Sequence, residues 1–465
     1  MRVLLISTYE LGHQPLHVAA PAAELLAAGH EVVALDLAVE GWDPGILEDV
    51  DAVAISVPMH TALRLAIEAA RRIRAGFPDL PVALYGLYAG VGQERTLGAV
   101  ADRLICGEYE DALVAWVDSL AGPGQHKGVS VDIGRRRFRT PARHLLPSLD
   151  KYAHLATAAG HEVVGYVEAS HGCRHRCSHC PVPAVYNGRY RITGVDTVLA
   201  DIDQLVAAGA GHVTFGDPDF LNAPAYALEV IEAAHGRFPD LSFDVTVKVE
   251  HILAHRDTWS RLAQAGVVFV VSAIESLDQE ILDRLAKDHT AADADEAVGV
   301  VREAGIDLHP TWLPFTPWTT ASAVADIASF IWRHDLVPVT DPVQLSIRLL
   351  IPDGSLMLAI DDLSPYLTGY DADALGYTWR AADPAMEELQ IRLAAVAETG
   401  SARGEDPADT LAAMTQWIGE AAGMPVDTRV LAGAVPVDRP RLSEPWFCCA
   451  EPTTVQMGVF DGANK

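Results

Sequence analysis

The sequence has no apolar run long enough to span a bilayer, which takes about 18 uninterrupted residues. The apolar segment at its start, Met1–Ile6, is too short for a secretory signal. Internal repeats and low-complexity tracts are also missing. We therefore expect a soluble, cytoplasmic protein with no membrane partner.

Basic residues are scarce in this chain. It has 34 lysines and arginines against 63 aspartates and glutamates, which gives a formal net charge of −29. Such a charge repels nucleic acid and anionic lipid, so we expect neither as a partner. We interpret the one basic cluster, Arg135–Arg139, as a contact between domains.

Cysteine is also rare, and its placement is informative. A disulfide framework is unusual in a chain of 465 residues without an export signal. Half of the six cysteines stand within eight residues, and this clustering predicts a metal or iron–sulfur site. The clustered cysteines are Cys173, Cys177 and Cys180, and the others are Cys106 and the adjacent pair Cys448 and Cys449.

The N-terminal part of the chain alternates strand-like and helix-like patterns. The expected strands are Arg2–Ser7, His30–Leu37, Ala52–Val57, Pro81–Tyr85 and Arg103–Cys106. This alternation predicts a doubly wound parallel sheet, in which ligands bind beyond the carboxyl ends of the strands. Four large side chains follow those ends and form a candidate ligand platform: Tyr9, Met59, Tyr88 and Tyr109.

A second series of β/α units begins at Glu162. Its expected strands are Val163–Glu168, His212–Phe215, Phe243–Val247, Val267–Val271, Asp307–Leu313 and Val343–Leu349. Six such units predict an incomplete barrel, related to the closed barrel of eight units. After Pro352 the pattern becomes mostly helical.

The clustered cysteines follow the first strand of this second series. Thiolates separated by three and then two residues can bind three irons of a cubane cluster and leave the fourth iron open. A zinc site completed by His171, His175 or His179 would use the same thiolates, and buried structural cysteines are a further alternative.

This cysteine spacing, at the end of a first barrel strand, resembles the radical S-adenosylmethionine (SAM) superfamily. The resemblance covers roughly residues 160–350. It implies one 4Fe-4S cluster whose open iron binds the amino and carboxylate groups of SAM. It also implies an electron donor such as flavodoxin or ferredoxin, cleavage of SAM to a 5′-deoxyadenosyl radical, and a small-molecule substrate.

Three further segments strengthen the resemblance. Gly216 and Asp217 follow the second strand, where the superfamily has a Gly-Gly-Glu-like turn that binds the SAM amine. Glu275 lies in a segment that looks like the Gly-Ile-Glu-Ser stretch after the fourth strand, and Lys248 could pair with a substrate carboxylate. Each match is weak alone, because an acid after a strand is often a helix cap.

The N-terminal unit resembles the cobalamin-binding domain of cobalamin-dependent radical SAM enzymes. This resemblance implies a corrinoid at the carboxyl edge of the sheet, near the four platform side chains. The Asp-x-His-x-x-Gly motif that supplies a histidine to cobalt is absent, and His13 and His60 do not fit that pattern. We therefore expect cobalt without a protein imidazole. A domain that has lost its corrinoid is the alternative.

The pair Cys448 and Cys449 stands in a segment that reads Trp-Phe-Cys-Cys-Ala-Glu-Pro. Adjacent cysteines rarely form a disulfide, but two neighbouring thiols can bind a soft centre or act as a redox relay. The segment resembles the tail of radical SAM proteins ending in Cys-Cys-Ala-Glu-Pro, some with selenocysteine at one position. We expect both cysteines to be catalytic; two buried tail cysteines are the alternative.

Taken together, these resemblances imply an α/β protein in four parts. They are a cobalamin-binding-like domain (1–122), a connector (123–160), a partial (β/α)6 radical SAM barrel (161–355) and a mostly helical region with the Cys-Cys tail (356–465). The implied activity is cobalamin-dependent methyl transfer, or related radical chemistry, in specialised metabolism. One alternative transfers a SAM-derived group, such as aminocarboxypropyl, to arsenite bound by the cysteine pair. A non-catalytic cobalamin or metal sensor is the third hypothesis.

Overall fold

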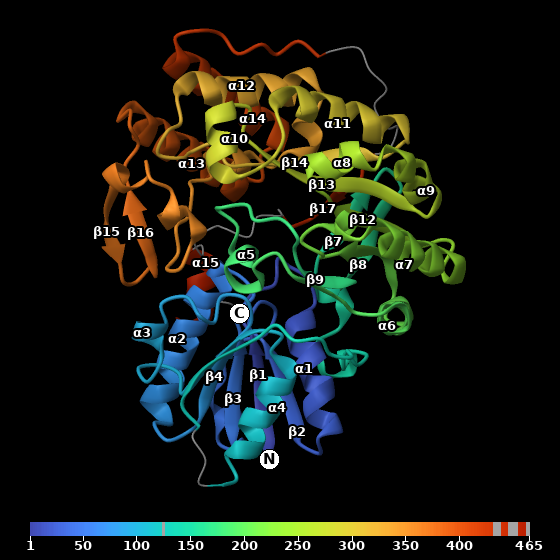
Figure 1. Cartoon of the computed structure of the whole chain (residues 1–465), viewed down its shortest axis with the longest axis vertical. Helices are drawn as coiled ribbons and strands as arrows, with labels where there is room; N and C mark the ends of the chain where they lie inside the picture. Colours follow the sequence, from blue (N-terminus) through green and yellow to red (C-terminus); the bar gives the residue numbers. More distant parts are fainter. Residues whose placement is uncertain (123–125, 431–438, 445–453, 462–465) are drawn as a thin grey trace.

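Two α/β bodies, one above the other, make up the protein (Figure 1). The structure is a computed structural model that describes residues 1–122, 126–430, 439–444 and 454–461. In Figure 1 the strands of the N-terminal body run toward the second body, so their carboxyl ends lie at the junction between the two. Within the described residues, no helix combines the length and apolarity needed to cross a bilayer.

The N-terminal body is a parallel sheet of six strands in the order β2-β1-β3-β4-β5-β6. Its strands are β1 (Arg2–Ser7), β2 (Glu31–Asp36), β3 (Ala52–Ser56), β4 (Val82–Tyr85), β5 (Arg103–Gly107) and β6 (Gly128–Asp132). Its helices are α1 (Leu16–Ala27), α2 (His60–Gly76), α3 (Gln93–Thr96) and α4 (Glu110–Ser119). Apolar residues of α1 and α4 cover one face and those of α2 the other, as expected for a doubly wound sheet.

The sixth strand, β6, was not among the expected strands. It pairs in parallel with β5 and lies in the segment that the sequence assigns to the connector. Its apolar side chains, Val129 and Val131, are exposed, so the strand carries no buried apolar pattern. An edge strand whose apolar side chains are exposed has the same sequence pattern as a linker.

The second body is a curled half-barrel sheet of seven strands in the order β14-β13-β12-β11-β8-β7-β17. The parallel strands are β8 (Gly160–Val167), β11 (Ala210–Phe215), β12 (Ser242–Thr246), β13 (Val267–Glu275) and β14 (Asp307–Trp312). Two short antiparallel strands, β7 (His154–Thr157) and β17 (Arg441–Leu442), extend the β8 edge. The helices that pack on its outer face are α6 (Val195–Ala207), α7 (Pro224–Arg237), α8 (Val249–Ala254), α9 (Trp259–Gln264), α11 (Ala291–Glu303) and α12 (Ala321–Arg333).

The prediction of a sixth parallel barrel strand at Val343–Leu349 is wrong. A short 3-10 helix, Pro342–Ser346, occupies most of that segment, and only the single bridge between Phe315 and Arg348 continues the sheet. Asp341 explains the difference, because its side chain accepts the Val343 N–H and starts a turn. Pro342 favours the same turn and lacks the N–H that a central strand would use.

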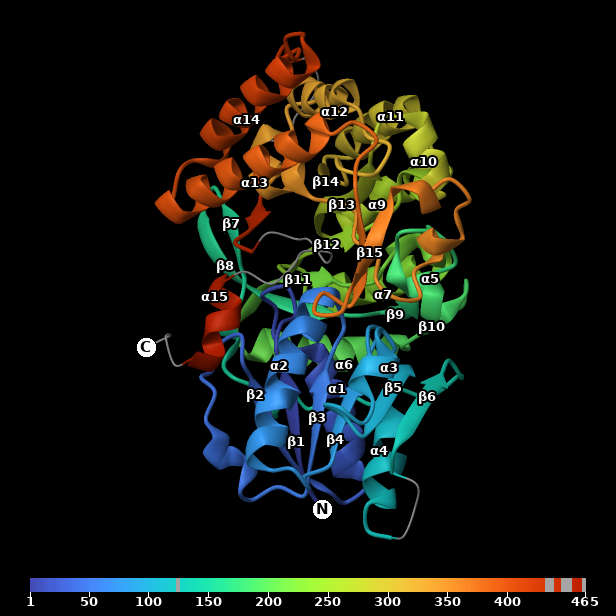
Figure 2. The ribbon, with the colours of Figure 1, turned by 90° about the vertical axis from the view of Figure 1, so that its left-hand side faces the viewer.

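The C-terminal region contains two long helices, α13 (Ala385–Arg403) and α14 (Pro407–Ala422), which pack against the half-barrel core. It also contains a hairpin of β15 (Leu367–Asp371) and β16 (Gly376–Trp379), so it is only partly helical. At its end, α15 (Thr454–Met457) lies beside the N-terminal body (Figure 2). There Phe460 packs into the N-terminal core, and Arg72 of α2 donates a hydrogen bond of 2.7 Å to its carbonyl.

Candidate functional site

The three clustered cysteines lie on one loop between β9 (Ser170–Gly172) and α5 (Pro181–Tyr186). Cys173 and Cys177 are buried and Cys180 half-buried, and all three are free thiols. Gly172 turns the chain into this loop at a φ of 76°, where an added Cβ would lie 2.5 Å from a carbonyl oxygen. Asn222 anchors the loop, because its Oδ1 accepts the Arg174 N–H at 3.1 Å and lies 3.7 Å from the Cys173 Sγ.

This donor set fits a 4Fe-4S cluster. Three free thiols on one loop can bind three irons and leave the fourth open to SAM. Two of the three histidines that could give zinc a fourth ligand are engaged elsewhere. His171 pairs with Glu108 at 3.1 Å, and His179 contacts Glu275 at 3.2 Å. These contacts favour a cluster over zinc at the three thiols.

Glu275 ends β13 with a left-handed φ of 66° and is nearly buried. Its Oε1 lies 3.3 Å from the Lys287 Nζ and 3.2 Å from the His179 Nε2. Burial alone would raise the pKa of Glu275, but Lys287 and His179 outweigh it and lower that pKa to about 2. A permanent carboxylate therefore stands beside the cysteine loop, and its contact with SAM stays a prediction.

Gly216 and Asp217 follow β11. A Cβ on Gly216 would lie 1.9 Å from the Tyr166 hydroxyl, so only glycine fits beneath that ring. Asp217 is buried and accepts hydrogen bonds from the Ala169 N–H at 2.9 Å and the Ser170 hydroxyl at 2.5 Å. Burial raises the pKa of Asp217 to about 7 despite these bonds. The carboxyl group thus holds the start of β9, and its contact with the SAM amine stays a prediction.

Lys248 follows β12 and is also buried. Its Nζ lies 3.3 Å from Glu250, and its backbone N–H faces Asp219 at 3.4 Å. Sequence reasoning missed Asp219, which is fully buried two residues after Asp217, and His251, which lies 2.9 Å from it. The repeated acid in Gly-Asp-Pro-Asp-Phe was the available signal.

The four platform side chains do not all lie together. Tyr9, Met59 and Tyr88 belong to the core cluster on the α2 face of the N-terminal sheet. Tyr109 packs on the opposite face, with its ring centroid 5.0 Å from that of Tyr85. Burial, and to a smaller degree Glu444, raises the pKa of Tyr9 to about 12. The structure therefore brings three of these side chains together and separates Tyr109 from them, and their contact with a corrinoid stays a prediction.

A chain of acids and imidazoles joins the carboxyl edge of the N-terminal sheet to the cysteine loop. Its consecutive members are Glu10, His17, Glu168, His171, Glu108 and Tyr186, with contacts of 2.9 to 3.5 Å. Sequence reasoning missed this network because its members are dispersed along the chain. It brings the end of β5 directly against the segment that carries the three cysteines.

The pair Cys448 and Cys449 lies outside the described residues, so its catalytic role stays a prediction, as does the arsenite alternative. Of the chain before it, β17 and Glu444 are described, and they line a pocket inside the half-barrel. Phe269 and His309 form another part of its wall, with stacked rings 4.1 Å apart between centroids. This pocket is a candidate substrate cavity.

Comparison with known proteins identifies the second body. Residues 167–317 match the model of the Radical SAM superfamily. The chain contains a radical SAM domain. This domain implies a 4Fe-4S cluster and SAM as cofactors, and the matched residues include all three clustered cysteines, Cys173, Cys177 and Cys180.

One curated protein is similar in sequence to about half of the chain. The chain is 25% identical over 247 residues to a hopanoid C-2 methylase of Rhodopseudomonas palustris, a match that spans 51% of this chain and 44% of that protein. It therefore covers less than half of that relative.

Two solved structures resemble the fold of most of this chain. The cobalamin-dependent enzyme OxsB with aqua-cobalamin and SAM has a TM-score of 0.64 at 14% identity, covering 84% of this chain and 66% of OxsB. The methyltransferase TsrM of Kitasatospora setae, with cobalamin and a [4Fe-4S] cluster, has a TM-score of 0.62 at 16% identity, covering 94% and 91%.

Proposed function

We propose that this protein is a cobalamin-dependent radical SAM enzyme that transfers a methyl group to a small molecule. The observation that carries the proposal is the contact between the carboxyl edge of the N-terminal sheet and the cysteine loop. Glu108, just after β5, lies 3.1 Å from His171 and 2.9 Å from the Tyr186 hydroxyl. A corrinoid at that edge would therefore face the cluster across the junction of the two bodies.

The N-terminal edge fits a large flat ligand. The strand order around β1 and β3 contains a topological switch point, where doubly wound sheets bind ligands. The strand ends there carry small residues, Ser7, Ser56 and Gly107, and Gly86 follows β4. Gly86 has a φ of 116°, and a Cβ on it would lie 3.1 Å from the Val57 carbonyl, so a glycine lets the two strand ends approach closely there.

Apolar contact would come from the three platform side chains that lie together. Tyr9, Met59 and Tyr88 pack on one face of the sheet beside this edge. His60 is fully buried against the Tyr88 ring, with centroids 6.2 Å apart, and His13 is buried against Tyr166. We infer that neither imidazole binds cobalt.

In the half-barrel, Cys173, Cys177 and Cys180 would hold the cluster. When bound, the cluster supplies the electron that cleaves SAM to a 5′-deoxyadenosyl radical. Glu275, fixed by Lys287 and His179, offers a permanent carboxylate for a SAM hydroxyl or amine.

The substrate, we infer, occupies the pocket lined by Phe269 and His309. Burial lowers the pKa of His309 to about 4, so its ring is neutral at physiological pH. Arg441 and Glu444 also line the pocket, which therefore suits a small substrate with both apolar and polar surface. Cys448 and Cys449 follow this wall in sequence, and we propose that they act on the substrate there.

Production of 5′-deoxyadenosine tests the proposal. Anaerobic protein reconstituted with iron and sulfide should release it from SAM in the presence of a reductant. The Cys177→Ala variant should release none. The matched control is Cys106→Ala, because Cys106 is a buried thiol at the end of β5, outside the loop, and should not be needed. Equal release by both variants would contradict the proposal.

A further inference from the structure

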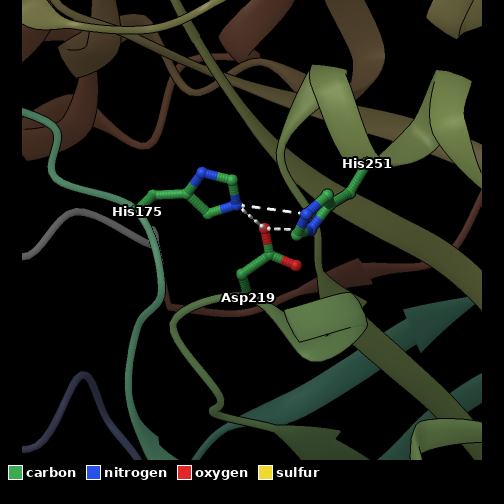
Figure 3. A group of neighbouring side chains, drawn as sticks. All are labelled: His175, Asp219 and His251. Carbon is green, nitrogen blue, oxygen red and sulfur yellow. Dashed lines mark hydrogen bonds and ion pairs between the residues drawn. The ribbon is translucent and has the colours of Figure 1, made fainter. Parts of the chain in front are cut away.

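Two histidines and an aspartate converge beside the cysteine loop (Figure 3). His175 belongs to that loop, Asp219 to the loop after β11, and His251 to α8. The His175 Nε2 lies 3.2 Å from the His251 Nε2 and 3.8 Å from the Asp219 Oδ2, which lies 2.9 Å from the His251 Nδ1. One ligand atom of each residue lies within 4.8 Å of the other two.

Hydrogen bonds account poorly for this arrangement. The Asp219 side chain is 0% exposed, and its carboxylate accepts only backbone N–H groups, from Leu221 at 3.0 Å and Lys248 at 3.4 Å. The ammonium group of Lys248 is directed to Glu250 at 3.3 Å. The His251 Nδ1 is buried and makes no hydrogen bond, although it lies close to Asp219. A buried carboxylate beside a ring nitrogen without a hydrogen bond calls for a cation between them.

We propose that His175, Asp219 and His251 bind one divalent transition-metal ion, separate from the iron–sulfur cluster. Ligands held about 2.0–2.1 Å from a tetrahedral ion lie about 3.3 Å from one another. The His175 Nε2 lies near that separation from the His251 Nε2, whereas Asp219 lies nearest the other ring nitrogen, Nδ1, so the His251 ring would turn to offer one nitrogen to the ion. Two imidazoles and one carboxylate suit zinc or ferrous iron, whereas magnesium and calcium prefer oxygen ligands. Three protein ligands leave at least one coordination position open to water or a substrate atom.

The surroundings of the three ligands fit a metal site. The second ring nitrogen of His175, Nδ1, faces a carboxylate oxygen of Glu250 at 3.6 Å. Metal-binding histidines commonly orient themselves through such a carboxylate. The backbone bonds to both oxygens of Asp219 fix its orientation in the same way.

The position of His175 gives the site a consequence for the cluster. His175 stands between Cys173 and Cys177, so an ion would tie the cysteine loop to α8 and to the loop after β11. The loop would then be held at its centre as well as at Asn222. The three ligands also lie next to Lys248, whose backbone N–H faces Asp219 at 3.4 Å.

Zinc is the probe that tests this site, because its content can be measured apart from iron. Cluster-loaded full-length protein is incubated anaerobically with zinc sulfate, desalted and analysed for both metals. The wild type should retain about one zinc per chain with its iron unchanged. X-ray absorption at the zinc edge should show nitrogen and oxygen ligands only. Sulfur ligands would overturn the proposal, because they would place the zinc on cysteines.

Matched variants connect the zinc to these residues. His251→Ala and Asp219→Asn should each lower the retained zinc below about 0.1 per chain. Asp219→Asn keeps the side-chain shape and an acceptor for Leu221, and circular dichroism and iron content verify the fold of both. His255→Ala is the control, because its ring lies 5.5 Å from that of His251 but outside the group, and it should keep its zinc. Zinc retained by both test variants would overturn the proposal, whatever the result of the 5′-deoxyadenosine assay.

Discussion

At the scale of single residues, the carboxylate of Glu275 is the most constrained charge near the cysteine loop. It is nearly buried, and it contacts the buried ammonium group of Lys287 and the ring of His179. A pair of this kind contributes little net stability relative to apolar residues, but removing one partner leaves an uncompensated buried charge. The pair of Glu275 and Lys287 therefore mainly fixes the position of the Glu275 carboxylate at the end of β13.

We expect Glu275→Gln to lower the free energy of unfolding by about 3–5 kcal/mol at pH 7, because Lys287 is left unpaired. The double variant Glu275→Gln/Lys287→Met should recover most of that loss. Because the folded pKa of Glu275 is lowered to about 2 from 4.5, its contribution is present above pH 4.5 and is lost as the pH falls toward 2. Urea unfolding at pH 7 and pH 4 measures both effects; a double variant no more stable than the single one would contradict this account.

At the scale of elements, Arg143 is a connector side chain that bonds to both bodies. Arg143 is buried, forms two bonds of 2.9 Å to Asp201 of α6, and donates to the carbonyl of Tyr166 at 2.6 Å. A further contact of 3.2 Å reaches the carbonyl of Gln14 in the N-terminal body. Such a bidentate, buried pair fixes the connector against both bodies.

Arg143→Met should therefore destabilise the protein by about 3–5 kcal/mol, because Asp201 loses its partner in a buried site. Limited proteolysis should then cleave the connector, residues 123–160, before either body. Arg139→Met is the matched control: its bond to Glu24 is exposed, and its loss should cost at most about 1 kcal/mol. Equal effects of the two substitutions would show that Arg143 has no special role in joining the bodies.

The elements that could be predicted from sequence are those with a buried apolar run. Strand β1 was predicted with its observed bounds, and β8, β11, β12, β13 and β14 were predicted to within a few residues, because each contains a buried apolar run. The strands β6, β7 and β17 were missed, since they are short and partly exposed. The segment after Asp341 was predicted as a strand that does not form. Its apolar pattern favours a strand, but Pro342 and the capping side chain of Asp341 favour a 3-10 helix instead.

In the candidate site, the residues that could be predicted are those that lie close together in the sequence. The cysteine loop could be predicted because its ligands are adjacent in sequence. The contacts of Asp219 with His251, and of Glu108 with His171, join residues far apart in the chain, and only the fold brings them together. Tyr109 was misplaced relative to the other platform residues because strand ends alone do not tell which face of a sheet the next side chain covers.

At the scale of the whole molecule, the junction between the two bodies contains buried ionisable groups. His17 of the N-terminal body lies between Glu10 at 3.0 Å and Glu168 of the half-barrel at 3.5 Å, and Glu168 also contacts His171 at 3.3 Å. Burial alone would lower the pKa of His17, but Glu10 and Glu168 raise it to about 9. A protonated His17 therefore links the two bodies at neutral pH.

The positive charge of His17 predicts that the free energy of unfolding declines at alkaline pH. Since the folded pKa of His17 lies above its ordinary value of 6.5, the stabilisation is complete below pH 6.5 and is lost as the pH rises through about 9. The loss should not exceed about 1.4 kcal/mol per pH unit. Urea unfolding between pH 6 and pH 10 should show this slope for the wild type and a smaller one for His17→Gln. Identical slopes would assign the effect to another group.

The central claim is that the N-terminal sheet presents a corrinoid to the cluster of the half-barrel. Electron paramagnetic resonance of the cobalt(II) form of cobalamin, added anaerobically to the cluster-loaded protein, tests it most directly. The account predicts one bound corrinoid per chain, with no nitrogen splitting from a histidine, since His13 and His60 are buried in the core. A spectrum identical to that of free cobalamin would contradict the claim.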